Sequence, residues 1–148
     1  MAETATLSKL LHIRENEKKE AKQAYHQSMD FFEGIATRLY TLLKRKENAE
    51  DSYDDCLSAT SSVEIIKEQV AFIELLNNQI MNLQQQVQIA RADMESKQMK
   101  LSDAYVEVKK FEKIIDTRKK SEEEMEIKRE KASMDEVSIQ QYLRYKNR

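Results

Sequence analysis

The chain has 148 residues, of which 40% are hydrophobic, 7% aromatic and 35% charged, with one glycine and no proline. This composition excludes an ordinary globular domain and is typical of long helices or coiled coil. The 25 basic and 27 acidic residues give a net charge of -2, which argues against a general nucleic-acid binder, because such proteins need a cationic surface.

The first predicted element is a helix over residues 5–57. Its apolar residues recur at alternating spacings of four and three, which places them on one helix face. A parallel row that contains Ile35 and Leu42 widens this apolar face. We assign to the helix-pairing seam a row that includes Met29, Phe32, Leu39 and Leu43.

The stretch "CLSATSSV" at residues 56–63 is where the helical pattern stops and restarts. Ser61 followed by Glu64 fits a capping box, in which the serine hydroxyl accepts from the backbone N–H of Glu64 and the glutamate reaches back to the N–H of Ser61. We therefore expect a tip at residues 58–61 and a second helix from residue 62. A loop this short joins antiparallel neighbours.

The second predicted helix covers residues 62–135 and carries a stricter pattern than the first. Spacings of four and three alternate without interruption, which predicts a left-handed coiled-coil seam with one charged member, Lys97. The row consists of Leu76, Ile80, Leu83, Val87, Ala90, Met94, Lys97, Leu101, Ala104, Val108, Phe111 and Ile115.

A tail at residues 136–148 completes the chain, with too few apolar residues to fold alone. At a rise of 1.5 Å per residue the first helix would measure about 75 Å and the second about 110 Å, so the second arm extends beyond the first. The predicted fold is all-α: one domain of two long helices in an antiparallel coiled-coil hairpin, with the second helix longer.

No residue pattern in the chain indicates an enzyme, a metal site or a bound cofactor. The acidic group at residues 50–55 lacks the spacing and the glycine of an EF-hand. His12 and His26 are separated by about 21 Å along one helix and cannot share a metal. Cys56 has no histidine near it in sequence, and phosphate-binding loops and zinc patterns are absent. We expect neither a nucleic-acid partner nor a small-molecule substrate.

The expected compartment is the cytoplasm. Cys56 is the single cysteine, so no internal disulfide is expected and a reducing environment is favoured. The N-terminal segment lacks the apolar core of a secretory signal. No stretch approaches the about 20 apolar residues that span a bilayer.

Both ends of the chain resemble those of FliJ, a family of small proteins of the bacterial flagellar export apparatus. The similar segments are "LSKLLHIRENEKKEA" near the start, "VEVKKFEKI" at residues 106–114 and "MDEVSIQQYLRYKNR" at residues 134–148. The chain length and the single loop near residue 60 are similar too.

The resemblance implies a non-enzymatic stalk. In the family, the paired ends of the hairpin insert into the ring of the export ATPase FliI and promote its assembly. Family members also contact the export gate protein FlhA and escort flagellar export chaperones. The implied location is the cytoplasmic face of the membrane, where the export apparatus holds the protein peripherally.

Residues that the family uses for gate binding can be carried over by their position relative to the loop. Arg45 and Ala49 stand where family members can carry tyrosines. The matching or equivalent positions are Leu42, Phe72, Leu76, Gln79 and Leu83. Leu76 and Leu83 also belong to the predicted seam.

Two alternatives stay open at this point. One is the equivalent stalk of a virulence type III secretion system. The other is a passive scaffold coiled coil that assembles with itself or with a cytoskeletal partner. A stalk predicts a monomer with an internal seam when free, whereas a scaffold predicts intermolecular seams.

Overall fold

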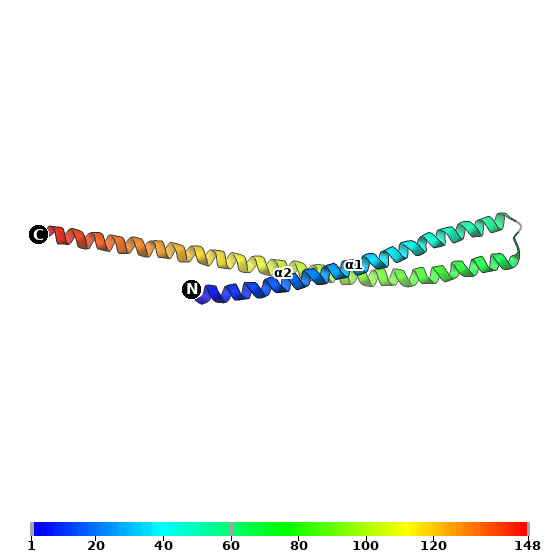
Figure 1. Cartoon of the computed structure of the whole chain (residues 1–148), viewed down its shortest axis with the longest axis horizontal. Helices are drawn as coiled ribbons and strands as arrows, with labels where there is room; N and C mark the ends of the chain where they lie inside the picture. Colours follow the sequence, from blue (N-terminus) through cyan, green and yellow to red (C-terminus); the bar gives the residue numbers. More distant parts are fainter. Residues whose placement is uncertain (1, 60, 148) are drawn as a thin grey trace. The chain divides into compact units, whose positions relative to one another are not determined.

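The computed structural model describes residues 2–59 and 61–147, and every regular element in this part of the chain is an α-helix. Helix α1 runs from Ala2 to Ser58 and contains 57 residues, and helix α2 runs from Val63 to Lys146 and contains 84 residues. The two helices form a hairpin in which α2 is the longer arm (Figure 1). The predicted all-α antiparallel hairpin is confirmed.

The helices extend further than the sequence predicted. Helix α1 begins at Ala2 rather than residue 5, and α2 continues to Lys146, past the predicted end at residue 135. Residues 136–146 contain no glycine or proline to stop the helix. Arg144 and Lys146 in the last turn also interact favourably with the negative end of the helix dipole. Residues 136–146 of the predicted tail therefore lie within α2, and residue 148 lies outside the described residues.

The N-terminal cap of α2 lies one residue later than predicted. Ser62, not Ser61, accepts a hydrogen bond from the backbone N–H of Ile65 at 3.4 Å. The N–H of Ser61 donates instead to the carbonyl of Ala59 at 2.9 Å, so it is not the partner of Glu64. Residue 60 of the predicted tip lies outside the described residues. Serine and threonine favour such caps and turns over helix interiors, which explains why α1 stops here.

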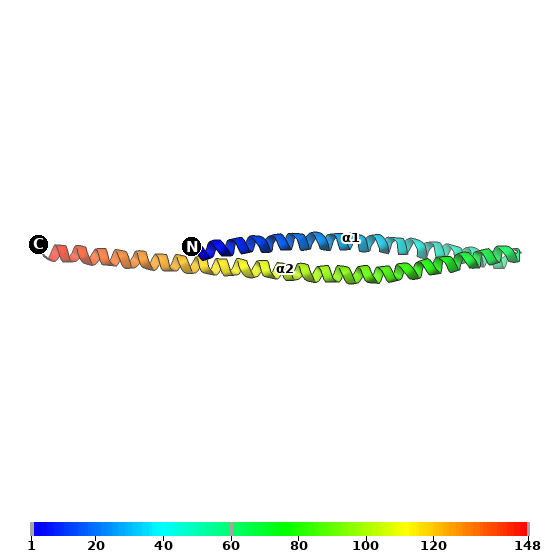
Figure 2. The ribbon, with the colours of Figure 1, turned by 90° about the horizontal axis from the view of Figure 1, so that it is seen from below.

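The chain divides into two compact units, and each contains part of both helices. One unit comprises residues Lys19–Ser102 and includes the turn; we call it the loop unit. Within it, the helices lie antiparallel (Figure 2). Rows at alternating spacings of three and four are buried or half-buried on both helices. These rows consist of Ala21, Tyr25, Ser28, Phe32, Ile35, Leu39, Leu42, Lys46, Ala49, Tyr53 and Cys56 on α1, and Ile66, Gln69, Ile73, Leu76, Ile80, Leu83, Val87, Ala90, Met94, Lys97 and Leu101 on α2.

The α1 row differs at two positions from the predicted seam. Ser28 rather than Met29 is buried, and Leu42 rather than Leu43 is half-buried at the interface, while Leu43 is 44% exposed. Met29 is half-buried beside the row. Two adjacent apolar rows run along this part of α1, and the serine at position 28 made the wrong row look the more apolar one. Phe32 and Leu39 lie in the row as expected.

The other unit comprises the residues up to Lys18 and those from Asp103 onward; we call it the terminal unit. Val108 and Ile115 are buried on α2, and Phe111 is half-buried between them. Polar contacts join the helices near the start of α1: the Thr4 hydroxyl donates to Glu122 at 3.1 Å, and Arg118 pairs with Glu3 at 2.7 Å.

Cation–π contacts add to this pairing. The ammonium of Lys18 lies 4.3 Å from the ring centroid of Tyr105, and the guanidinium of Arg14 lies 5.7 Å from that of Phe111. Such contacts are worth about 0.5–1 kcal/mol at exposed sites. They allow two cations to occupy seam positions of α1 without leaving the helix interface.

Within the terminal unit, α2 continues beyond the N-terminal end of α1 (Figure 1). Glu122, which accepts the hydrogen bond from Thr4, lies beside the first turn of α1. Every residue from Asp116 to Asn147 is exposed. We call residues 123–147 the α2 extension.

Candidate interaction face

Two adjoining grooves lie along one side of the loop unit. The first is lined by Thr37, Arg38, Thr41, Leu42, Arg45 and Leu83. The second is lined by Arg45, Asn48, Ala49, Ser52, Gln69 and Phe72. Arg45 borders both grooves, so they form one continuous surface, which we call the Arg45 face.

The predicted gate-binding residues gather on this face, with one exception. Leu42 and Leu83 form the apolar floor of the first groove, and Phe72, 47% exposed, lines the second. Gln79 is exposed on the same side of α2, seven residues after Phe72 and therefore nearly in line with it. Leu76 is only 2% exposed. Its side chain belongs to the helix interface and offers almost no surface to a partner.

Helical spacing explains why residues so distant in sequence share the face. On α1, Arg38, Thr41 and Arg45 recur at intervals of three and four and flank the buried row on one side. On α2, Phe72 and Gln79 flank the buried row on the same side. Because the helices run antiparallel, residues before the turn in α1 meet residues after the turn in α2.

The chemistry of the Arg45 face suits a protein partner. Exposed apolar surface from Phe72 lies in the same groove as Arg45, and Arg38 and Thr41 line the adjoining groove. Aromatic residues and arginine are enriched at the centres of protein–protein interfaces. Arg38 and Arg45 were not predicted as partner contacts. Their spacing of seven residues places them on one side of the apolar row, and this spacing could have indicated a shared surface.

The described residues contain no group of three or more histidine, cysteine, aspartate or glutamate side chains placed to hold a metal ion. Cys56 is half-buried as part of the helix-pairing row. His12 and His26 are exposed on α1. In the part of the chain that the structure describes, neither helix has a stretch apolar and long enough to cross a membrane.

Comparison with known proteins gives a match along nearly the whole chain. A family model described as "Flagellar FliJ protein" matches residues 3–147. The "Flagellar FliJ protein" of Bacillus subtilis (strain 168) is 34% identical over 143 residues, which is 97% of this chain and 97% of that protein. No solved structure matches.

Proposed function

The chain belongs to the FliJ family of flagellar proteins, non-enzymatic components of the flagellar export apparatus, and from that premise we propose that it is the central stalk of the export ATPase ring. In this role it promotes assembly of the FliI ring through its terminal unit. The Arg45 face of the loop unit contacts the export gate protein FlhA. Export chaperones are further partners.

The observation that carries the proposal is the exposed α2 extension. A helix of this length without a hairpin partner has a whole circumference available for contact. Its charges of both signs and scattered apolar residues, such as Met134 at 71% exposure and Tyr145 at 82%, give no single large apolar patch. A stalk inside a ring meets several identical subunits in turn, and many weak contacts suit that arrangement better than one strong one.

The gate contact is supported by the surface that the Arg45 face presents. Phe72 is its exposed aromatic residue, with Gln79 beside it on α2 and Arg45 across from it on α1. Leu42 and Leu83 contribute at the groove floor. Leu76 acts indirectly, because its burial holds the two helices together beneath the face.

The proposed location follows from these partners. A chain that binds both the export ATPase and the gate is held at the cytoplasmic face of the membrane through them. The free chain is a monomer, because the seam that a scaffold coiled coil would offer to another copy is occupied within the hairpin.

Purified FliI, with and without the full chain, tests the stalk. We expect the full chain to raise the ATPase rate per FliI molecule and to shift FliI toward hexamers in sedimentation velocity at the same protein concentration. A rate and a sedimentation profile that do not change at a stoichiometric excess of the chain would contradict the proposal.

Phe72→Asp tests the gate contact. An aspartate at this exposed position places an unpaired charge in the interface, so we expect binding to the FlhA cytoplasmic domain to weaken by about tenfold or more, which corresponds to about 1.4 kcal/mol. Stimulation of FliI by the same variant should be retained. Unchanged affinity for FlhA would mean that neither Phe72 nor the Arg45 face takes part in the gate contact.

A further inference from the structure

The loop unit has a second apolar row on α1 that the hairpin does not use. Met29, Ala36, Tyr40 and Leu43 lie beside the buried row on the side away from Arg38 and Arg45. Tyr40 is 62% exposed and Leu43 is 44% exposed. A helix that pairs with one neighbour needs only a narrow seam, whereas two adjacent rows are typical of a helix with two neighbours.

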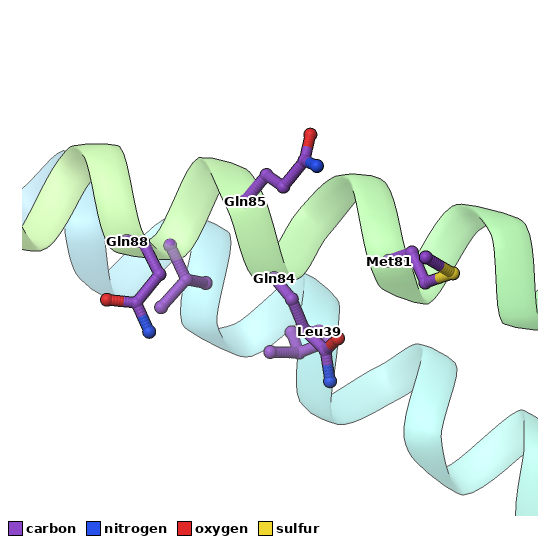
Figure 3. Close-up of a pocket in the computed structure, with 6 residues that line it drawn as sticks. Leu39, Met81, Gln84, Gln85 and Gln88 are labelled. Atoms are coloured by element: carbon purple, nitrogen blue, oxygen red, sulfur yellow. The ribbon is translucent and has the colours of Figure 1, made fainter.

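Helix α2 has a matching row on the same side. Met81, Gln84 and Gln88 line a groove together with Leu39 of α1 (Figure 3). Figure 3 shows Gln84 on the side of α2 that faces Leu39, while Gln85, which also lines the groove, extends away from α1. The guanidinium of Arg91, three residues beyond Gln88, lies 5.8 Å from the ring centroid of Phe32.

Helical spacing places the two rows on the same side of the hairpin and so along one trough, which we call the Tyr40 face. A second groove, which shares no lining residue with the first, lies on α1 and is lined by Phe32, Glu33, Ala36, Thr37 and Tyr40. Phe32 and Leu39 belong both to the helix-pairing seam and to this trough. The face is therefore a continuation of the hairpin interface, open at the place where a third helix would pack.

Charge is nearly absent from this part of the chain. From Leu75 to Ala90 there is no charged residue, and between Gly34 and Leu43 the one charge is Arg38, on the opposite flank of α1. The whole chain, by comparison, is 35% charged. Charges border the surface on α1, where Glu33 lines a groove and the ammonium of Lys44 lies 5.9 Å from the ring centroid of Tyr40. A partner that covers the uncharged stretch of α2 removes few ions from water, and ion removal is the main cost of binding a mixed-charge helix surface.

We infer that the Tyr40 face is a docking groove for one amphipathic helix of a partner protein. The helix packs an apolar row against Met29, Ala36, Tyr40, Leu43 and Met81, and it presents uncharged hydrogen-bonding side chains to Gln84 and Gln88. The span from Asn77 to Arg91 is about 21 Å, so the bound helix covers about four turns. The inference concerns the side of the loop unit opposite the Arg45 face and does not depend on the proposed function.

A synthetic peptide of about 20 residues provides the probe, a length at which an isolated helix begins to be populated in water. It carries leucine at heptad positions a and d, glutamine at e and g, and alternating lysine and glutamate elsewhere, with a fluorescent label at one end. Fluorescence anisotropy with the full chain measures its affinity. A second peptide with glutamate at e and g is the matched control.

We expect the glutamine peptide to bind at micromolar concentration and the glutamate peptide to bind at least about tenfold more weakly, because its charges would be buried beside amides. Tyr40→Asp should lower the affinity of the chain for the glutamine peptide by a similar factor. Ile89→Asp, which changes an apolar residue of 71% exposure outside the groove, should leave the affinity within about twofold. NMR spectra should show shifts of the side-chain amides of Gln84 and Gln88 on binding.

Three outcomes would overturn the inference. One is no binding of the glutamine peptide at millimolar concentration. The second is equal binding by the wild type and Tyr40→Asp. The third is a wild-type chain that sediments as a dimer and becomes a monomer in Tyr40→Asp, which would make a second copy of the chain the occupant of the groove. Circular dichroism of both aspartate variants checks that the hairpin is intact.

Discussion

At the scale of single residues, two adjacent leucines of α2 have opposite environments. Leu76 is 2% exposed at the helix interface, whereas Leu75 is 54% exposed. We expect Leu76→Ala to lower the free energy of unfolding by about 2–3 kcal/mol, the lower part of the range for buried leucine, because a two-helix interface encloses the cavity incompletely. Urea unfolding followed by circular dichroism measures the change.

Leu75→Ala is the matched control for that experiment, since it removes the same atoms from an exposed site. Its effect should remain within about 0.5 kcal/mol. Equal losses in the two variants would mean that the helix-pairing row is displaced from Leu76. A large loss of stability in Leu76→Ala would also explain any loss of gate binding by that variant without a direct contact.

The serines at the turn provide a second residue-scale prediction. Ser62 caps α2 through the N–H of Ile65, and Ser61 has no such role. We expect Ser62→Ala to destabilise the hairpin by about 0.5–1 kcal/mol, because one N–H at the helix start loses its acceptor. Ser61→Ala in the same urea experiment should cost less. A larger loss of stability in Ser61→Ala than in Ser62→Ala would identify Ser61 as the cap.

At the scale of the helices, Ser28 and Lys97 form a polar level in the interface. Leu42 of α1 and Leu83 of α2 line the same groove. Ser28 lies two heptads before Leu42 and Lys97 lies two heptads after Leu83, so the antiparallel helices bring the two residues to the same level. Ser28 is buried and its hydroxyl donates to the carbonyl of Tyr25 at 2.7 Å, while Lys97 is half-buried. A lysine in this position packs its aliphatic stem and keeps its ammonium near water. A polar level among apolar ones favours a single alignment of the two helices.

Replacing Lys97 with leucine should therefore make the hairpin more stable. We expect Lys97→Leu to raise the free energy of unfolding by about 1 kcal/mol, since more apolar surface leaves water. Lys100→Leu, at an exposed position, should change it by less than about 0.5 kcal/mol. A loss of stability in Lys97→Leu would indicate that the ammonium makes an interaction on which the interface depends.

The two helices also differ in how far their sequences predicted their packing. The α2 row from Leu76 to Ile115 carries apolar residues at nearly every seam position, so spacing alone placed it. On α1 two apolar rows compete, and spacing cannot tell which one faces α2. Only the packed structure shows that Ile35 and Leu42 face inward while Tyr40 and Leu43 face out.

The candidate sites were predictable to different degrees. Phe72 and Gln79 were placed by resemblance, and the structure puts both on an exposed face beside Arg45. Leu76 could not be assigned from resemblance alone, because a leucine at that position satisfies both a seam and a partner contact. The Tyr40 face requires rows from both helices, and sequence spacing does not show which side of α2 meets which side of α1.

At the scale of the whole molecule, the central claim is that the α2 extension acts on the ATPase ring. Glu122 is the last residue of α2 with a described contact to α1, through Thr4. A chain that ends at Glu122 therefore keeps the hairpin interface and removes the extension. Its unfolding midpoint in urea should match that of the full chain, because the removed residues are exposed.

The most direct test is the rate of ATP hydrolysis by FliI, measured with the full chain and with the chain that ends at Glu122. We predict that the full chain stimulates the rate and that the shortened chain, although folded by circular dichroism and still able to bind FlhA, does not. Full stimulation by the folded shortened chain would contradict the account, because the stalk would then act without its extension.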